Sequence, residues 1–461
     1  MNALTLTTAR SAATAVVGLF CLAVAPPCFG ETVPAKAFPT AEGFGAQSLG
    51  GRGGDVHLVT NVNDGGPGSL RACVDASGPR TCVFRIGGTI ALDSSLAVVN
   101  PYLTIAGQTA PGSGILLRNA SGNDGATLSI RTHDVIVRHL RARPGPSAAS
   151  SSIDALQIIR GAHDVIIDHT SLSWAVDENL DISSYDGQDP KRVTIQWSII
   201  AEGLDKSVHT KSKKHSKGIL LSSGQTGGSG NNFTLHHNLL AHSRDRMPEI
   251  DNAGITDVVN NTLYNSKSEF GEFWSTFGDN SINFIGNYAR PGPDTVKRIK
   301  EVDMKPVNYD LRIYVANNFG PKRHNGTMPE EATLDPEDRQ FLIAHPLPTP
   351  PVTTTTSEEA YEDVLTLAGA TVPMRDDVDT RIVAEVRSRS GRIPNHPDDV
   401  GGYPIMHSAE APRDSDSDGM PDSWEAERGL DPNNPEDRNS DADADGYTAL
   451  EEYLNALAGD D

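Results

Sequence analysis

Short apolar segments alternate with polar turns along the chain from about residue 90 to residue 320. The centres of seven segments are separated by steps of 30, 28, 40, 25, 24 and 31 residues, at Val135, Val165, Val193, Phe233, Val258, Ile282 and Ile313. Periods in this range are typical of a solenoid, in which each unit buries its apolar face against the next. Helical periodicity is scarce in these units, so we expect short strands joined by turns. The repeats therefore predict an all-β solenoid.

Asparagine recurs directly after these segments, at Asn238, Asn260, Asn261, Asn287, Asn317 and Asn318. Stacked turn asparagines hydrogen-bond backbone groups and tolerate the left-handed conformation of a tight bend. We therefore expect a right-handed parallel β-helix. A β-sandwich is the alternative, but it would show strands every 8 to 12 residues or so and hairpin dipeptides, and these signals are weak here.

The first 30 residues have the pattern of a secretory signal. Arg10 precedes the apolar run 12–27, and small residues follow it. The run is shorter than the roughly 18 apolar residues that a membrane helix needs, and no other stretch reaches that length. We expect residues 1–30 to be removed and the mature protein to be secreted as a monomer without a membrane span.

Of the four cysteines, Cys21 and Cys28 would leave with the signal. Cys73 and Cys82 remain as one even pair in an exported chain, which favours a disulfide over two free thiols. Such a bond would close a short loop and have no chemistry of its own.

The net charge of −22 argues against nucleic acid as a partner. It also argues against an anionic membrane surface or any polyanion, unless a cation lies between the two.

The repeats weaken after about residue 320. The Pro- and Thr-rich segment 345–359 is expected to form a strut or external loop, because it has no apolar face to bury. Segments 361–369 and 378–388 are expected to be short amphipathic helices that lie against the solenoid. We expect the solenoid domain to span residues 31–405 and a distinct acidic segment to span 406–461.

The acidic segment contains two calcium-loop motifs of the form D-x-D-x-D-G-x5-E. The first has the candidate ligands Asp414, Asp416, Asp418, Asp422 and Glu425, and the second has Asp441, Asp443, Asp445 and Glu452. A disordered solubilising tail would explain the charge but not two tandem motifs at this spacing. No convincing helix precedes Asp414, so the segment resembles the calcium repeats of dockerin or thrombospondin type 3 segments, with a structural or attaching role.

Polar residues also occupy corresponding positions on successive solenoid units. One segment supplies Asp168, and the next supplies Asp177, Glu178 and Asp181. Neighbouring carboxylates of this kind are the ligands that a hard cation such as Ca²⁺ prefers, although surface acids would have the same pattern. Lys217 then precedes an apolar strand, and the charged stretch RDRMPEID, residues 244–251, follows one unit later.

At this point the sequence resembles the secreted pectate lyases of the pectate lyase C and pectin lyase superfamily. The resemblance covers most of residues 38–405, with its motifs in the family's order. The matching segments are 50–74, 87–92, 103–112, VIIDH (165–169), VDENLDIS (176–183), 193–200, HSKGILLSS (215–223), HHN (236–238), RMP (246–248) and 398–404. The fold that the resemblance implies is the same β-helix that the repeats predict.

The resemblance also implies roles for individual residues. Asp168, Asp177 and Asp181 would bind a catalytic calcium ion, with Lys217 contacting an acidic polysaccharide. Arg246 would be the base, and the family pattern R-x-P-x-x-R has Asp251 in place of its second arginine.

That departure puts the binding of the substrate carboxylate in doubt. Arg244 or a lysine of the run 211–214 could compensate, and Arg244 and His215 are candidate substrate-binding residues beside Lys217. His169, His236 and His237 are a competing acid–base set, although hydrogen bonding in turns is the more frequent role of such histidines.

Three functions follow from these observations. The first is a calcium-dependent lyase that cleaves a uronic-acid polysaccharide, with pectate the best match. The second is a glycoside hydrolase on the same fold, which needs two carboxylates flanking the bond. The third is a non-catalytic, calcium-stabilised polysaccharide binder.

Overall fold

The computed structural model describes residues 1, 7, 35–146, 152–209, 214–225 and 230–460. The chain divides into two compact units, Met1–Pro34 and Ala35–Asp461. Apart from Met1 and Thr7, the predicted secretory signal lies outside the described residues. The described strands and helices all belong to the second unit.

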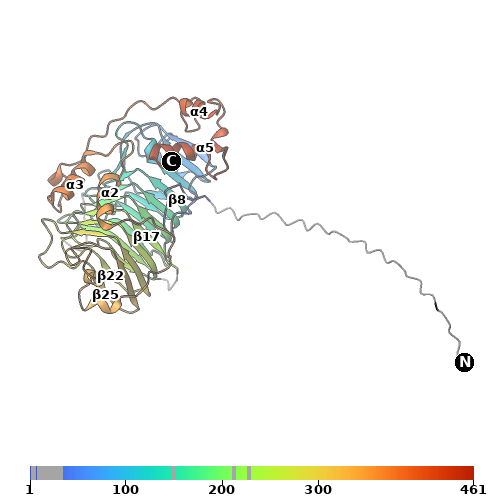
Figure 1. The fold of residues 1–461 in the computed structure, drawn as a ribbon. Coiled ribbons are helices and arrows are strands. Elements are labelled where there is room, and N and C mark those ends of the chain that lie inside the picture. Colours follow the sequence, from blue (N-terminus) through green and yellow to red (C-terminus); the bar gives the residue numbers. More distant parts are fainter. Residues whose placement is uncertain (2–6, 8–34, 147–151, 210–213, 226–229, 461) are drawn as a thin grey trace. The chain divides into compact units, whose positions relative to one another are not determined.

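Three parallel sheets enclose one core (Figure 1), and the chain passes through sheets A, B and C in turn. In the described part of the chain, sheet A has 10 strands and sheets B and C have 8 each. Neighbouring strands of a sheet come from successive turns of the chain, so every sheet is parallel. The predicted all-β, right-handed parallel β-helix is confirmed.

The strands have the following bounds. Sheet A contains β1 (Asp55–Val59), β2 (Arg80–Phe84), β5 (Leu103–Ala106), β8 (His133–Arg138), β11 (His163–Asp168), β14 (Lys191–Gln196), β17 (Phe233–His236), β20 (Gly254–Val259), β23 (Asn280–Ile285) and β26 (Leu311–Ala316). Sheet B contains β3 (Gly88–Leu92), β6 (Ile115–Asn119), β9 (Arg141–Ala142), β12 (Ser171–Ser173), β15 (Ile199–Ala201), β18 (Leu239–Ala241), β21 (Thr262–Tyr264) and β24 (Tyr288–Arg290). Sheet C contains β4 (Leu96–Val98), β7 (Leu128–Ile130), β10 (Leu156–Ile159), β13 (Glu178–Ser183), β16 (Lys217–Ser223), β19 (Glu249–Asn252), β22 (Glu272–Trp274) and β25 (Asp303–Lys305).

The apolar residues that mark the repeat in the sequence all lie on sheet A, where they stack inside the core. One position of the predicted alignment differs. Thr256, not Val258, pairs with Phe233, so the local steps are 23 and 26 residues. Thr256 and Val258 of β20 are both buried. Val258 was chosen in the sequence alignment because its side chain is apolar.

An asparagine ladder runs along the turn between sheets A and B. The side-chain oxygen of Asn261 accepts from the backbone nitrogen of Asn238 at 2.9 Å, and Asn287 and Asn318 continue the pattern at 2.9 Å each. The preceding residue has a left-handed backbone, with φ of 53° at Asn260. The two expected roles of turn asparagines, backbone hydrogen bonding and the left-handed conformation, are therefore taken by adjacent residues.

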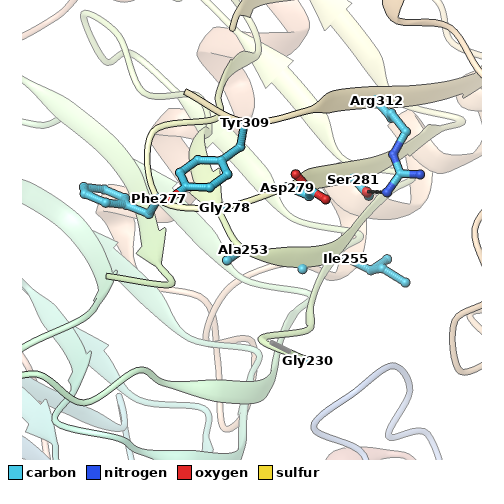
Figure 2. A pocket seen from close by; sticks show the side chains of 10 residues that line it. Gly230, Ala253, Ile255, Phe277, Gly278, Asp279, Ser281, Tyr309 and Arg312 are labelled. Carbon is cyan, nitrogen blue, oxygen red and sulfur yellow. Dashed lines mark hydrogen bonds between the residues drawn. The ribbon is translucent and has the colours of Figure 1, made fainter. Parts of the chain in front are cut away.

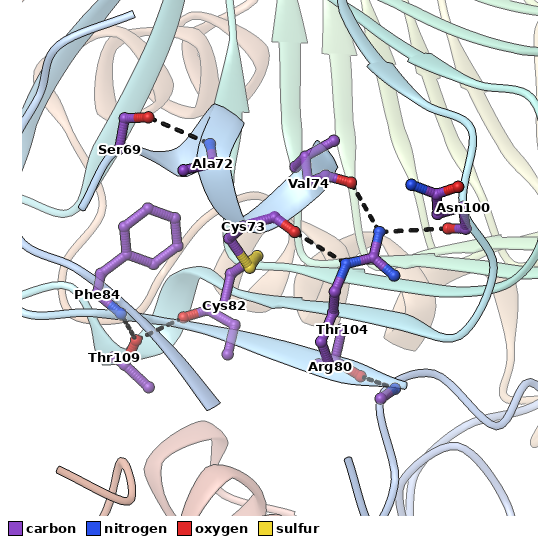
Figure 3. The surroundings of a disulfide bond; sticks show 12 residues. Ser69, Ala72, Cys73, Val74, Arg80, Cys82, Phe84, Asn100, Thr104 and Thr109 are labelled. Carbon is purple, nitrogen blue, oxygen red and sulfur yellow. Dashed lines mark hydrogen bonds between the residues drawn. A yellow bond between two sulfur atoms is a disulfide. The ribbon is translucent and has the colours of Figure 1, made fainter. Parts of the chain in front are cut away.

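The predicted disulfide between Cys73 and Cys82 is confirmed, with Cα atoms 5.9 Å apart (Figure 3). It joins α1 (Leu70–Asp75) to β2 at the first turns of the solenoid. The fully buried Arg80 lies beside it and donates to the carbonyl oxygens of Cys73 at 2.8 Å and Val74 at 2.7 Å. Together these contacts fix the helix to the strand.

Two helices lie against the solenoid, as the sequence predicts, and they pack on the outer face of sheet B. They are α2 (Ser357–Leu367) and α3 (Asp377–Ser388). Their apolar faces, including Val364 and Ile382, form one cluster with Ile199, Leu239 and Tyr264 of sheet B. The Pro- and Thr-rich segment before α2 hydrogen-bonds to turn side chains instead, as where Thr355 N donates to Asn260 Oδ1 at 3.0 Å.

The acidic C-terminal segment contains α4 (Asp422–Arg428) and α5 (Ala449–Ala458). Its apolar residues pack with Val56 and Ala106 of sheet A, at the first turns of the solenoid. The expected boundary at residue 405 stays a prediction, because Ala35–Asp461 form a single compact unit. Among the described helices, none is long and apolar enough to cross a membrane.

Candidate active site

The outer face of sheet C carries a line of polar side chains. Apolar residues alternate along its strands and fill the core, so the residues between them face outward. In register across successive turns, the outward positions are Ser129, Gln157, Asp181, Leu220, Glu249, Glu272 and Asp303. We call this surface the sheet C face.

A second line of charged residues lies at or just before the starts of the sheet C strands. Leu156 pairs with Leu180, which places Asp154 beside Glu178 on the next turn. Glu178 in turn pairs with Lys217 at the start of β16. One turn later Asp245 pairs with Lys217, and the next residue is Arg246, whose carbonyl oxygen accepts from Ile219 N at 2.7 Å. Two acids are therefore followed by Lys217, and Arg246 lies next to the acid that pairs with Lys217.

The acids of this line form a compact group. One carboxylate oxygen each of Asp154, Asp177 and Glu178 lie within 4.8 Å of one another. Asp154 Oδ1 accepts from Glu178 N at 2.9 Å, and one oxygen of Asp181 is buried without a hydrogen-bond partner among the described residues. An oxygen-rich donor set with an orphaned buried oxygen fits a hard cation such as Ca²⁺.

The electrostatics of the group point the same way. Burial and the neighbouring carboxylates raise the pKa values of Asp154 and Glu178 well above the usual range. Burial raises the pKa of Asp181 to about 6. Without a cation, these acids disfavour one another's charged form.

Asp177 differs from the other acids because two histidines contact it. His215 Nε2 lies 2.5 Å from Asp177 Oδ1, and His209 Nε2 lies 3.1 Å from Oδ2. Burial opposes ionisation here, but the hydrogen bond from His215 holds the pKa of Asp177 below its usual range. His215, expected to bind substrate, is thus placed where it orients an acid.

Lys217 and Arg246 both form ion pairs on this face. Lys217 Nζ pairs with the carboxylate of Asp245. Arg246 pairs with Glu178 through Nη1, and its Nε lies 2.8 Å from Glu249 Oε2. Although burial opposes it, these carboxylates raise the pKa of Arg246. The guanidinium is 22% exposed, so it is only partly shielded from solvent.

Asp168 does not join this group, and the predicted ligand set is corrected. It is the last residue of β11 on sheet A and is fully buried. Its oxygens accept from Arg138 Nε at 2.8 Å and Gln196 Nε2 at 2.9 Å, and one lies 2.8 Å from His169 Nδ1. With its lone pairs used inside sheet A, Asp168 cannot share a cation with Asp177 and Asp181 on sheet C.

The competing histidines also lie away from the sheet C face. His169 and His237 stack with Trp197 along the turn between sheets A and B, at centroid distances of 6.1 and 4.3 Å. His236 is buried and lies 3.1 Å from the Gln196 side-chain oxygen. Burial lowers the pKa of His236 well below the usual range. Their arrangement supports hydrogen bonding and stacking over acid–base chemistry.

No protein-family model matches the sequence, but individual relatives do. "Probable pectate lyase C" of Aspergillus flavus is 37% identical over 429 residues, covering 91% of this chain and 94% of that protein. The protein of the same name from Emericella nidulans is 35% identical over 449 residues, covering 95% of this chain and 96% of that protein. The chain belongs to the pectate lyase family. The prediction of a polysaccharide lyase is thereby confirmed.

Among solved structures, Jun a 1, the major allergen from cedar pollen, aligns over 71% of this chain and 92% of that chain. Its sequence identity is 18% and its TM-score 0.49.

The position that departs from the pectate lyase pattern lies on the sheet C face. Asp251 is in β19, opposite Ser222, and its Oδ1 accepts from Thr276 N at 2.8 Å. Burial raises the pKa of this carboxyl. A carboxylate therefore stands where the pectate lyase pattern has a second cation.

The residues considered as substitutes for that cation have other contacts or lie outside the described residues. Arg244 Nη1 is 3.4 Å from Asp205 Oδ1, and its backbone nitrogen donates to Ser216 O at 2.8 Å. Residues 211–213 of the lysine-rich run lie outside the described part of the chain. Lys305 is a cation that the sequence did not reveal. It lies on the sheet C face over the Trp274 ring at 4.8 Å.

Sequence reasoning missed Asp154 in this acid group, and it named Glu178 as a candidate cation ligand but left it out of the set that the resemblance implies. The signal that could have found Asp154 is an internal match between neighbouring turns. DALQI (154–158) and ENLDI (178–182) each have an acid two positions before a buried leucine.

The predicted C-terminal ligands fall into two loops that differ in burial. In the first, oxygens of Asp414, Asp416 and Asp418 lie within 4.8 Å of one another, and Glu425 is fully buried. In the second, the loop acids are exposed and accept hydrogen bonds from backbone nitrogens of the same loop. For example, Asp441 Oδ2 accepts from Gly446 N at 3.1 Å. Calcium binding by the second loop stays a prediction for Asp441, Asp443, Asp445 and Glu452.

A separate pocket of about 500 Å³ lies at the turns that enter sheet A (Figure 2). Phe277, Tyr309 and Arg312 line it, and Arg312 donates to Ser281 Oγ at 3.1 Å. Among the described residues, none of the predicted site residues lines this pocket.

Proposed function

We propose that the protein is a secreted, calcium-dependent pectate lyase that cleaves polygalacturonate by β-elimination and acts as a monomer. The observation that carries the proposal is the line Asp154, Glu178 and Lys217, which stands in register across successive turns of sheet C, with Arg246 directly after the Asp245 that pairs with Lys217. It combines a buried acidic cation site with two partly exposed basic groups at sheet C.

The acids Asp154, Asp177, Glu178 and Asp181 would hold the calcium ion. When bound, calcium neutralises substrate carboxylates and acidifies the adjacent C5–H as a Lewis acid. A bridging cation also accounts for how a chain of net charge −22 attracts a polyanion. The histidines on Asp177 would orient that carboxylate rather than bind the ion, because calcium prefers oxygen ligands.

The elimination requires three changes in the substrate. A base removes the proton from C5, a double bond forms between C4 and C5, and the bond from C4 to the glycosidic oxygen breaks. The departing oxygen then takes a proton. Lys217 is a cation suited to stabilise the negative charge that develops on the carboxylate oxygens as C5 loses its proton.

Arg246 is the proposed base, by its match to the family arginine. An arginine is normally protonated in proteins, so this role needs surroundings that disfavour its charge. Glu178 and Glu249 raise its pKa in the absence of a cation. Recruitment of Glu178 as a calcium ligand would remove the first of these partners, which couples cation binding to the state of Arg246.

The substrate assignment takes Asp251 into account. A carboxylate at this position would repel a uronate bound nearby, so we expect weaker binding of fully charged pectate than in a lyase with two arginines. Lys305 lies further along the same face, where it pairs with Glu272. A longer substrate chain bound along this face would reach Lys305.

One assay with three possible outcomes separates the proposed function from its alternatives. Purified protein is incubated with polygalacturonate, with calcium or with chelator, and the ultraviolet absorbance of unsaturated uronate is followed. A lyase gives a calcium-dependent rise, a hydrolase gives reducing ends without it, and a binder gives neither. Absence of the unsaturated product from every uronan tried would refute the proposal.

A further inference from the structure

Five carboxylates of the C-terminal segment converge in one cluster. Oxygens of Asp414, Asp416 and Asp418 lie within 4.8 Å of one another, and so do oxygens of Asp418, Glu425 and Asp437. Asp418 belongs to both groups, so the five acids form a single site. We call it the C-terminal acid cluster.

The cluster contains buried oxygens that lack any partner in the described part of the chain. Glu425 is fully buried, and neither of its carboxylate oxygens has a hydrogen bond. One oxygen each of Asp416, Asp418 and Asp437 is also buried and unpartnered. Buried charged carboxylates without donors are strongly destabilising, and a bound cation would supply the missing partner to all of these oxygens at once.

The remaining oxygens keep the loop in shape. Asp418 Oδ1 accepts from Met420 N at 2.8 Å, and Asp437 Oδ2 accepts from Asp431 N at 2.8 Å. These hydrogen bonds to the backbone orient Asp418 and Asp437 so that their unpartnered oxygens lie in the same cluster. Arg85 lies 3.6 Å from Asp414 but, among the described residues, forms no ion pair with the other four acids. An all-oxygen set of five carboxylates suits Ca²⁺.

The ligand set differs from the one that the sequence motif predicts. The carboxylate of Asp422 accepts from Ser415 N at 2.7 Å and from Ser415 Oγ at 2.8 Å, at the exposed start of α4. It is occupied there and does not join the cluster. Asp437, which lies outside the motif, takes a place in it and connects the first loop to the start of the second.

The same loop attaches the segment to the solenoid. Met420 is fully buried and packs with Ala106, Leu450 and Leu454. A Cβ on Gly419 would lie 3.2 Å from side-chain carbons of Val56 in β1 and Val83 in β2, so the loop backbone touches the sheet directly. Because Asp418 is a member of the cluster and also binds Met420 N, the cluster and the anchor share one loop conformation.

Ion pairs fix the other end of the segment to the same turns. Arg52 Nε lies 2.8 Å from Glu451 in α5, and Arg138 Nη2 lies 2.7 Å from Asp460. Arg138 also holds the buried Asp168 of sheet A. Figure 1 shows α4 and α5 beside the N-terminal turns near β8.

We propose that a calcium ion bound by Asp414, Asp416, Asp418, Glu425 and Asp437 acts as a clasp that keeps the C-terminal segment folded onto sheet A of the first solenoid turns. The site is structural, and the inference does not rest on the proposed lyase activity. Without the ion, repulsion among the five acids opens the loop and withdraws Met420 from the core.

Two measurements test the clasp in the full-length protein. Terbium, a luminescent calcium analogue, is titrated in and excited through Trp424, which neighbours Glu425; the Trp424→Phe variant identifies the signal from this site. Calcium should displace terbium, and Glu425→Gln or Asp437→Asn should weaken calcium binding at least about ten-fold. Asp422→Asn is the matched control, because it changes a motif acid outside the cluster, and it should leave the affinity unchanged.

Hydrogen exchange supplies a readout that needs no variant. Chelator should increase exchange of the amides in 418–425 and in β1 together, while β23 and β26, at the opposite end of sheet A, keep their protection. Unchanged exchange in 418–425 on calcium removal, or wild-type calcium affinity in both Glu425→Gln and Asp437→Asn, would overturn the clasp. Loss of the clasp with retained lysis, or the reverse, separates this inference from the proposed function.

Discussion

Replacing Arg246 with lysine tests the proposed base while keeping a positive charge on the sheet C face. The guanidinium contacts Glu178 and lies 2.8 Å from Glu249, and a lysine can keep only one of these ion pairs in good geometry. Loss of one partly exposed ion pair costs about 1 kcal/mol or less in folding stability. Loss of a positioned base costs about 100-fold to 10,000-fold in rate, or about 3–5 kcal/mol in activation free energy.

The two effects separate in one set of assays. We expect Arg246→Lys to lower kcat on polygalacturonate at least about 100-fold with little change in KM, while the unfolding midpoint changes only slightly. Arg192→Lys is the control, because Arg192 also has a left-handed backbone and pairs with Asp164, but it lies on sheet A. Full lyase activity in Arg246→Lys would show that Arg246 is not the base.

Three further predictions concern other parts of the molecule. Asp251→Arg should lower KM for polygalacturonate, because it replaces a repelling carboxylate by a cation; an unchanged KM would remove Asp251 from the substrate path. Burial raises the pKa of the Glu301 carboxyl to about 7. The folded state therefore binds the proton more tightly than the unfolded chain, and stability falls as pH rises from about 4.3 to 7. Glu301→Gln removes that titration, so its unfolding free energy relative to wild type should rise by about 3 kcal/mol across this range, which urea unfolding at pH 4.5 and 7.5 measures. Serine at both Cys73 and Cys82, which are 9 residues apart, should lower stability by about 3 kcal/mol and leave kcat unchanged, because the bond lies at the first turns.

The solenoid could be predicted because its signal is local and repeated. Val135, Val165 and Val193 lie at corresponding positions of consecutive sheet A strands, and each reports the same buried position. The asparagine ladder is similarly visible, since each turn needs the same hydrogen bonds. The two amphipathic helices also follow from sequence periodicity, although sheet B as their docking surface does not.

The active site was only partly predictable, because the repeat that is easiest to see belongs to sheet A and the proposed chemistry lies on sheet C. Asp168 was expected to be a ligand because the VIIDH segment resembles the family motif, but its carboxylate forms a buried ion pair with Arg138. Asp154 was overlooked because it precedes a strand that carries no marked motif. Which carboxylates meet depends on strand register, and register is a property of the assembled solenoid.

The C-terminal ligands show the same limit at shorter range. The motif correctly brings Asp414, Asp416 and Asp418 together, since their spacing alone closes the loop. Asp422 and Asp437 exchange places in the cluster because the turn before α4 gives Asp422 a serine partner. Linear spacing cannot reveal a contact that a second loop supplies.

The central claim is that the acids and bases of the sheet C face together perform a calcium-dependent elimination. Its most direct test is the ultraviolet absorbance of unsaturated uronate released from polygalacturonate by the wild-type protein and by an Asp154→Asn variant, each with calcium or with chelator. The account predicts a rise for the wild type with calcium, no rise with chelator, and a strongly reduced rise for Asp154→Asn that higher calcium concentrations partly restore. Wild-type rates in Asp154→Asn at low calcium, or equal rates with and without chelator, would contradict it.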